Sequence, residues 1–250
     1  MKIVADNAIP FLKGVLEPYA RVEYLPGKTI ATADVRDADA LIVRTRTRCD
    51  AALLEGSSVK LIATATIGFD HIDTAWCAAH GIEVTTAAGC NARGVLQWVG
   101  AALVHLSRTQ GWQPAGRTLG VVGVGHVGSL VKAYAEGWGF RVVCCDPPRE
   151  EREHCGFLPL EEVAREADLL TFHTPLDAST RHMAGEGLLA RLKPGAVVMN
   201  SSRGEVVDGD ALLRSGHPCV LDVWEHEPHL DPQLLDRALL ATPHVAGYSE

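Results

Sequence analysis

Thr118-Leu119-Gly120-Val121-Val122-Gly123-Val124-Gly125-His126-Val127-Gly128 is the stretch of this 250-residue chain that decides its fold. A short apolar run ends here in the pattern G-x-G-x-x-G, and a helical pattern follows over residues 129–136. Between a strand and a helix, such glycines permit a tight turn, close approach of a pyrophosphate and close helix–strand packing, while the helix N-terminus attracts the anion. The stretch therefore predicts a dinucleotide-binding loop with cofactor contacts from Gly123, Gly125, His126, Val127 and Gly128.

An acidic residue, Asp146, ends the next predicted strand, residues 141–146. A carboxylate at that position accepts hydrogen bonds from the ribose hydroxyls of NAD and repels the additional phosphate of NADP. Arg149 follows within the same short segment, where its positive charge would weaken this preference. We therefore expect Asp146 to contact the cofactor and NAD to be that cofactor.

Outward from the loop, short apolar runs alternate with helical patterns along nearly the whole chain. This alternation predicts an α/β fold, in which parallel sheets carry helices on both faces. A long helical pattern, residues 94–108, joins two doubly wound parallel-sheet lobes, residues 1–93 and 94–250. Strands are predicted at residues 2–5, 22–25, 39–44, 60–65, 82–86, 118–123, 141–146, 169–173, 196–200, 219–223 and 240–244, and helices at residues 10–19, 73–80, 160–167 and 231–238. The six strands of the second lobe are what a Rossmann NAD-binding domain requires.

Composition and charge exclude several classes of protein. The net charge of −8 argues against a nucleic-acid partner, because such partners require a basic surface. No apolar run approaches the ~18 residues of a membrane-spanning helix, and Asp6 interrupts the apolar N-terminus, so neither a membrane anchor nor a signal peptide is predicted. Seven cysteines without C-x-x-C spacing indicate reduced thiols in a cytoplasmic protein. His226 and His229 flank Glu227, but Pro228 breaks any helical face there, and no metal site is expected.

Three further segments place polar groups directly after predicted strands. They are Asn200-Ser201-Ser202-Arg203-Gly204-Glu205-Val206-Val207-Asp208, Leu221-Asp222-Val223-Trp224-Glu225-His226-Glu227-Pro228 and Thr242-Pro243-His244-Val245-Ala246-Gly247-Tyr248. Ligands of open parallel sheets bind at the carboxyl ends of the strands. The three segments are therefore candidates for an active site.

Together with residues 63–73, 88–92, 145–148 and 171–176, these segments resemble the D-2-hydroxyacid dehydrogenase family over essentially the whole chain. The resemblance implies a substrate-binding, flavodoxin-like first lobe and an NAD-binding second lobe. It implies Arg203, Glu227 and His244 as the catalytic residues. It also implies cofactor contacts from Thr174, Asp222 and Gly247.

The chemistry of such an enzyme fits these three residue types. Oxidation of a secondary alcohol requires a base for the hydroxyl proton, and a histidine such as His244 titrates near neutrality. Glu227 would orient the imidazole and favour its protonated form, and Arg203 offers a planar fork for a substrate carboxylate. Each residue also has an ordinary interpretation, namely a surface ion pair, a solvated loop acid and a core histidine. Their joint occurrence after a nucleotide-binding motif favours the catalytic one.

The substrate is expected to contact the first lobe. In the family a loop of backbone N–H groups receives the substrate carboxylate, and here that loop is residues 66–68. The resemblance implies substrate contacts from Arg44, Thr45, Thr66, Gly68 and Tyr248. If the strand before it continues through Arg44-Thr45-Arg46-Thr47-Arg48, three arginines lie on one side, where they would capture a phosphorylated acid.

The resemblance implies oxidation of a small phosphorylated hydroxyacid, 4-phospho-D-erythronate, to its 2-oxo acid in the synthesis of pyridoxal phosphate (vitamin B6). Two alternatives remain open at this point. One is another D-2-hydroxyacid dehydrogenase, for example of 3-phosphoglycerate, and the other is a fragment that binds NADH without turnover.

Two departures from the family pattern bear on these expectations. The segment between Arg203 and Glu227 is short, which is expected either to shift Glu227 or to change a contact at the sheet edge. The chain also ends six residues after His244, so the C-terminal return helix and the dimerisation domain that gives full-length members a homodimer are expected to be absent.

Overall fold

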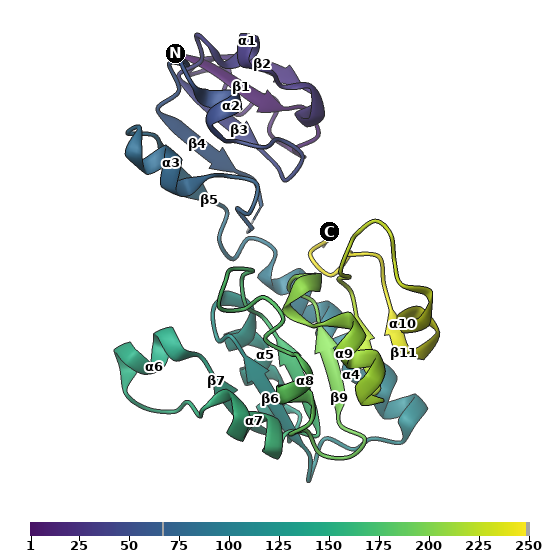
Figure 1. Ribbon diagram of the computed structural model, residues 1–250. Coiled ribbons are helices and arrows are strands. Elements are labelled where there is room, and N and C mark those ends of the chain that lie inside the picture. The colour runs from purple at the N-terminus through teal and green to yellow at the C-terminus, as the bar shows by residue number, and fades with distance from the viewer. Residues whose placement is uncertain (67, 249–250) are drawn as a thin grey trace. The chain divides into compact units, whose positions relative to one another are not determined.

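The computed structural model describes residues 1–66 and 68–248, and it divides the chain into two compact units, Met1–Cys90 and Asn91–Glu250. The division lies three positions before the boundary expected from the sequence. Each unit contains one parallel sheet with helices around it (Figure 1). The predicted α/β fold with two parallel-sheet lobes is thereby confirmed.

The sheet of the first unit has the strand order β2-β1-β3-β4-β5 and is parallel throughout. The order reverses between β1 and β3, and ligands of such sheets bind where the order reverses. Asp6 ends β1, and Arg44 follows β3 directly. The elements are β1 (Lys2–Asp6), β2 (Arg21–Leu25), the 3-10 helix η1 (Gly27–Thr29), α1 (Thr32–Val35), β3 (Ala40–Val43), α2 (Ala51–Leu54), β4 (Leu61–Thr64), α3 (Thr74–Ala79) and β5 (Glu83–Thr86).

Two sequence expectations for the first unit are wrong. Residues 10–19 form successive turns instead of a helix. Phe11 and Gly14 both adopt positive φ angles, 61° and 89°, and neither angle is compatible with a right-handed helix. The strand predicted at residues 39–44 does not continue through Arg48. Instead, β3 ends at Val43, because the chain turns at once and Thr47 donates a backbone hydrogen bond to the Arg44 carbonyl (3.2 Å).

The sheet of the second unit has the strand order β11-β10-β9-β8-β6-β7, again parallel. The order reverses between β6 and β8, so the loops after these two strands mark the expected ligand site. The strands are β6 (Thr118–Val122), β7 (Arg141–Cys145), β8 (Leu169–Phe172), β9 (Val197–Asn200), β10 (Cys219–Leu221) and β11 (Ala238–Ala241). The last strand begins and ends earlier than the predicted 240–244, which places His244 beyond it in a loop.

Two apolar clusters cover the two faces of this sheet. One contains residues of α4 and α5, and the other contains residues of α7, α8, α9 and α10. Cys144 belongs to the first cluster and Cys145 to the second, as adjacent strand residues must. The helices are α4 (Ala92–Gln110), α5 (His126–Gly137), α6 (Pro147–Glu153), α7 (Leu160–Glu166), α8 (Glu186–Leu189), the 3-10 helix η2 (Gly204–Val206), α9 (Gly209–Ser215) and α10 (Pro232–Arg237).

All seven cysteines are free thiols, and only Cys90 and Cys155 are exposed. Within residues 1–66 and 68–248, no helix is long and apolar enough to cross a membrane. The same residues contain no group of three or more histidine, cysteine, aspartate or glutamate side chains arranged to hold a metal ion.

Candidate active site

The glycine loop after β6 requires glycine at two of its three positions. Gly123 has a φ angle of 83°, and a Cβ there would lie 2.7 Å from the His173 carbonyl oxygen. A Cβ on Gly128 would overlap the Gly123 carbonyl oxygen. Because glycine has no Cβ, the first turn of α5 can pack closely against the end of β6. By contrast, the space around a Cβ on Gly125 is open to 4 Å. The loop is closed where it packs on protein and open where a ligand would approach.

The carboxylate of Asp146 is tied to this loop. Its Oδ2 accepts a hydrogen bond from the backbone N–H of Val124 (2.7 Å), and its Oδ1 accepts one from the N–H of Arg149 (3.0 Å). A carboxylate has about four acceptor positions, so both oxygens keep capacity for further donors. Asp146 is thus fixed at the end of β7 beside the glycine loop and is only partly buried.

These residues fit a dinucleotide. Gly125 opens the twelve-residue helix α5, whose first N–H groups suit a pyrophosphate. Across the switch point, the hydroxyl of Thr174 is buried and has no hydrogen-bond partner among the residues that the structure describes. Buried polar groups are nearly always paired, so a ligand bound beside the Thr174 hydroxyl would satisfy it.

Arg203 follows β9 in a turn that Asn200 organises. The buried Asn200 donates from Nδ2 to the Arg203 carbonyl (2.8 Å), and its Oδ1 accepts from the N–H (3.0 Å) and hydroxyl (2.8 Å) of Ser202. The guanidinium of Arg203 donates to the Ser202 carbonyl (2.7 Å). Next to it, Gly204 packs so tightly on the peptide between Trp224 and Glu225 that a Cβ would overlap that peptide. The loops after β9 and β10 are therefore in backbone contact.

Glu227 and His244 form a hydrogen-bonded pair. The Glu227 Oε2 accepts from the Nδ1 of His244 at 2.9 Å, and its Oε1 accepts from the backbone N–H of Trp224 at 2.9 Å. The hydrogen bond that His244 donates to Glu227 raises the pKa of His244 above 6.5. Burial raises the pKa of Glu227, but the bonds from His244 and Trp224 outweigh it, and the net pKa lies below 4.5.

The loop that carries His244 is held by the buried carboxylate of Asp222. His244 has a positive φ of 56°, which is unusual for a non-glycine residue. Its N–H donates to the Asp222 carbonyl (2.6 Å), and the Asp222 carboxylate accepts from the N–H groups of Val245 (2.8 Å) and Ala246 (2.9 Å) and the hydroxyl of Thr242 (2.6 Å). Asp222 therefore positions His244, and the expected contact of Asp222 with a cofactor stays a prediction.

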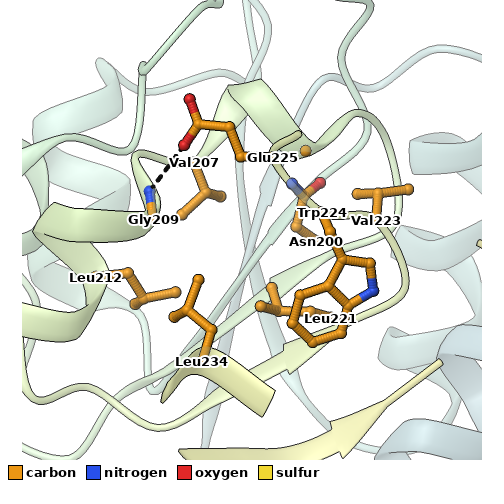
Figure 2. A pocket seen from close by; sticks show the side chains of 10 residues that line it. Asn200, Val207, Gly209, Leu212, Leu221, Val223, Trp224, Glu225 and Leu234 are labelled. Carbon is orange, nitrogen blue, oxygen red and sulfur yellow. Dashed lines mark hydrogen bonds between the residues drawn. The ribbon is translucent and has the colours of Figure 1, made fainter. Parts of the chain in front are cut away.

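A small cavity lies beneath the Trp224–Glu225 peptide (Figure 2). It encloses about 20 Å³, which is room for one water molecule and not for a substrate. Figure 2 shows the Glu225 carboxylate above it, bonded to the N–H of Gly209 (3.3 Å). The other Glu225 oxygen lies 2.6 Å from Nε2 of His182. This second histidine–carboxylate pair braces the loop that leads to Glu227.

A family profile matches the second unit. Residues 91–246 match the family described as "D-isomer specific 2-hydroxyacid dehydrogenase, NAD binding domain". The chain belongs to this family. The family expected from the sequence is therefore confirmed, and the second unit is an NAD-binding domain.

Individual relatives agree with the family assignment. The erythronate-4-phosphate dehydrogenase of Bacteroides fragilis is 50% identical over 260 aligned positions, which cover 100% of this chain and 75% of that enzyme. Among solved structures, the NAD⁺-bound 3-phosphoglycerate dehydrogenase of Entamoeba histolytica superposes with a TM-score of 0.83 at 26% identity, covering 99% of this chain and 91% of that one. The Aquifex aeolicus D-lactate dehydrogenase, complexed with NAD and lactic acid, superposes with a TM-score of 0.81 at 26% identity, covering 100% of this chain and 90% of that one.

The remaining expected contacts of the second unit lie next to His244. Gly247 packs on the first turn of α4, since a Cβ there would lie 2.6 Å from the Asn91 amide nitrogen. Tyr248 is 79% exposed. Cofactor contact by Gly247 and substrate contact by Tyr248 stay predictions.

In the first unit, Arg44 lies at the switch point expected of a ligand site. Its Nε donates to Oδ2 of Asp6 at 3.1 Å, and Asp6 is only 1% exposed. Gly27 covers this carboxylate, because a Cβ there would lie 2.6 Å from the same oxygen. Arg44 is thus anchored through Nε and keeps its terminal nitrogens for other acceptors.

The expected row of three arginines on one strand face is wrong. Because the chain turns after Val43, Thr47 is buried and donates to the Gly27 carbonyl (2.8 Å). Arg48 is 80% exposed and pairs with Asp50 (2.7 Å), so it forms an ordinary surface ion pair. Thr45 is exposed within the turn.

The loop after β4 is organised by hydroxyl groups. Thr66 donates to the Gly68 carbonyl (3.0 Å), and its oxygen lies 2.6 Å from the hydroxyl of Thr64. The Thr64 hydroxyl also lies 3.3 Å from Nε2 of His71. Ile67, the middle residue of the expected carboxylate loop, lies outside the described residues.

Four residues that shape these sites were missed by sequence reasoning: Asp6, Asn200, Glu225 and His182. Asp6 directly follows the strand predicted at residues 2–5 and Asn200 ends the strand predicted at residues 196–200, and these positions are the available signal. The pairing of His182 with Glu225 had no local signal, since 43 positions separate the two residues.

Proposed function

We propose that this chain oxidises 4-phospho-D-erythronate to its 2-oxo-4-phospho acid with NAD, a step in vitamin B6 synthesis. The observation that carries this proposal is the 50% identity to an erythronate-4-phosphate dehydrogenase over the entire chain. The identity to the 3-phosphoglycerate and D-lactate dehydrogenases is only 26%. The seven free thiols support a reducing, cytoplasmic setting.

The proton transfer is assigned to His244. Because Nδ1 is engaged by the Glu227 carboxylate, Nε2 is the nitrogen that accepts the proton of the substrate's 2-hydroxyl. The charge of Glu227 then stabilises the imidazolium that forms. Bound NAD supplies the acceptor for the hydride that leaves the same carbon.

The carboxylate and the developing carbonyl oxygen are assigned to Arg203. A guanidinium offers paired donors in a plane, which suits a carboxylate. The pair formed by Glu227 and His244 sets their pKa values, and the positive charge of Arg203 contributes a smaller lowering effect on both, so Arg203 acts on the same site as the pair. Arg44, Thr45, Thr66, Gly68 and Tyr248 are proposed as the other substrate contacts, with Arg44 receiving the phosphate.

The proposal is tested by following NADH formation with a panel of acids. Turnover of 4-phospho-D-erythronate, with little of D-erythronate, D-lactate or 3-phosphoglycerate, is the expected result. Preference for 3-phosphoglycerate would reassign the substrate. NADH binding without turnover of any acid would instead favour the nucleotide-binding alternative.

The rate of oxidation should depend on the protonation state of His244. Only the neutral imidazole accepts a proton, and Glu227 holds its pKa above 6.5. We therefore expect kcat/KM to rise with pH through that raised pKa. In Glu227→Gln the carboxylate charge is lost, so the pKa of His244 falls and the rising limb moves to lower pH. A pH profile of kcat/KM for both proteins measures this shift.

Glu186→Gln is the control for that experiment. It removes one negative charge from an exposed position at the start of α8. Its profile should match the unaltered protein, and an unshifted limb in Glu227→Gln would exclude Glu227 as the partner that sets the pKa of His244.

Arg44→Ala should impair the phosphorylated substrate selectively. Charge-assisted hydrogen bonds contribute about 1.5–3 kcal/mol, so KM for 4-phospho-D-erythronate should rise about 10-fold to 100-fold. KM for D-erythronate should change little. Damage to the fold would impair both acids alike, and equal effects would therefore refute phosphate binding by Arg44. Arg48→Ala, on the exposed ion pair, is the matched control.

A further inference from the structure

Arg149 lies beside the cofactor loop, held between two partners. One turn into α6, its Nη1 donates to the carbonyl of Val124 in the glycine loop (2.7 Å). Its Nε and Nη2 donate to the two carboxylate oxygens of Glu153, at 2.7 and 2.8 Å. The guanidinium carbon also lies 5.1 Å from the centre of the Phe157 ring. Arg149 and Glu153 therefore form a bidentate ion pair, and the Phe157 ring and the Val124 carbonyl hold the guanidinium plane in place.

The position of this arginine bears on the choice between NAD and NADP. Val124 contacts both groups, since its N–H donates to Asp146 and its carbonyl accepts from Arg149. The guanidinium of Arg149 is therefore separated only by the Val124 backbone from the Asp146 carboxylate, which is expected to face the ribose hydroxyls. In this fold a nearby arginine is the group that accommodates the 2′-phosphate of NADP. Asp146 and Arg149 consequently favour opposite cofactors.

We propose that Glu153 is a cofactor-specificity residue, which pairs with Arg149 and so withholds that guanidinium from the 2′-phosphate of NADP. In the pair, the charge of Arg149 is neutralised and its fork is occupied. Asp146 then decides the preference alone, in favour of NAD.

The charge balance around Arg149 supports this role. The hydrogen bonds that Arg149 donates to Glu153 lower the pKa of Glu153 and raise the pKa of Arg149, so both stay charged at neutral pH. The two side chains remain 29% and 39% exposed. The pair can therefore be broken by substitution without leaving a buried charge unpaired.

The test compares equilibrium binding of NADH and NADPH, which requires no substrate. Exposed ion pairs are weak, so Glu153→Gln should tighten NADPH binding relative to NADH by a small factor, up to about fivefold. Nucleotide fluorescence in a titration measures both dissociation constants. Retained NADH binding also shows that the variant has folded.

Glu136→Gln is the matched control. It breaks the Lys132–Glu136 pair (2.6 Å), another exposed i,i+4 ion pair of the same unit, and should leave the ratio of the two dissociation constants unchanged. Adding Arg149→Ala to Glu153→Gln should cancel the gain for NADPH. The proposal is overturned if Glu153→Gln leaves the ratio unchanged, if both glutamine variants shift it equally, or if the gain survives the loss of Arg149.

Discussion

Replacing His244 with glutamine should lower kcat for the proposed oxidation by about 10²–10⁴-fold, the usual contribution of a general base. Glutamine is close to histidine in length, and its amide can still donate to the Glu227 carboxylate that now holds Nδ1. It cannot accept the hydroxyl proton at any ordinary pH. NADH formation in single-turnover assays measures the loss, while NADH titration should show nearly unchanged binding.

His229→Gln is the control for this substitution. His229 is an exposed histidine of the preceding loop, and it takes no part in the Glu227–His244 pair. Its replacement should leave kcat within a few-fold of the unaltered protein. Activity of His244→Gln at the level of His229→Gln would exclude His244 as the base.

Gly204→Ala should have a large effect for the addition of a single methyl group. The added carbon would overlap the peptide between Trp224 and Glu225, and backbone on both sides must move. Overpacking of this kind costs about 3 kcal/mol or more of unfolding free energy. The displaced loops carry Arg203 and Glu227, and misplacement by ~1 Å costs about 10²-fold in rate. Denaturant unfolding and kcat/KM together measure the two consequences.

Gly187→Ala separates this contact from a general effect of adding a methyl group. Gly187 lies inside α8, and nothing occupies the space within 4 Å of a Cβ there. Alanine is the better helix former by about 1 kcal/mol, so this variant should be at least as stable as the original. If Gly204→Ala behaves like Gly187→Ala, the close contact with the Trp224–Glu225 peptide is not required.

The sheets could be predicted because buried parallel strands are continuous apolar runs. Residues 118–122 are apolar or small and are entirely buried, and β6 was predicted almost to the residue. Residues 10–19 have helical spacing of apolar side chains but form turns, because Gly14 takes a left-handed conformation and nothing in the pattern reveals it. The spacing of side chains does not reveal backbone dihedral angles, and here the positive φ angles of Phe11 and Gly14 prevent a helix.

The site could be predicted only in part, for a related reason. Arg203, Glu227 and His244 follow strands, and parallel strands bring their carboxyl ends to one edge of a sheet. The arginines after Val43 were placed by assuming that the strand continued, and the turn at Arg44–Thr47 separates them. The partners of the site residues lie far away in the sequence; Asp6, the partner of Arg44, is 38 positions away. Such pairs depend on the packed structure and leave no local pattern.

The distribution of thiols gives this chain two ready attachment points for dyes. Burial raises the pKa of Cys49 to about 12 and those of Cys145 and Cys219 to about 11, so these sulfurs stay protonated as well as shielded. Maleimides react with the thiolate and will therefore select the exposed Cys90 and Cys155. One of these belongs to each compact unit. A donor and an acceptor fluorophore can thus be attached without mutagenesis, and energy transfer between them would follow the distance from Cys90, where the two units join, to Cys155 while nucleotide and acid bind.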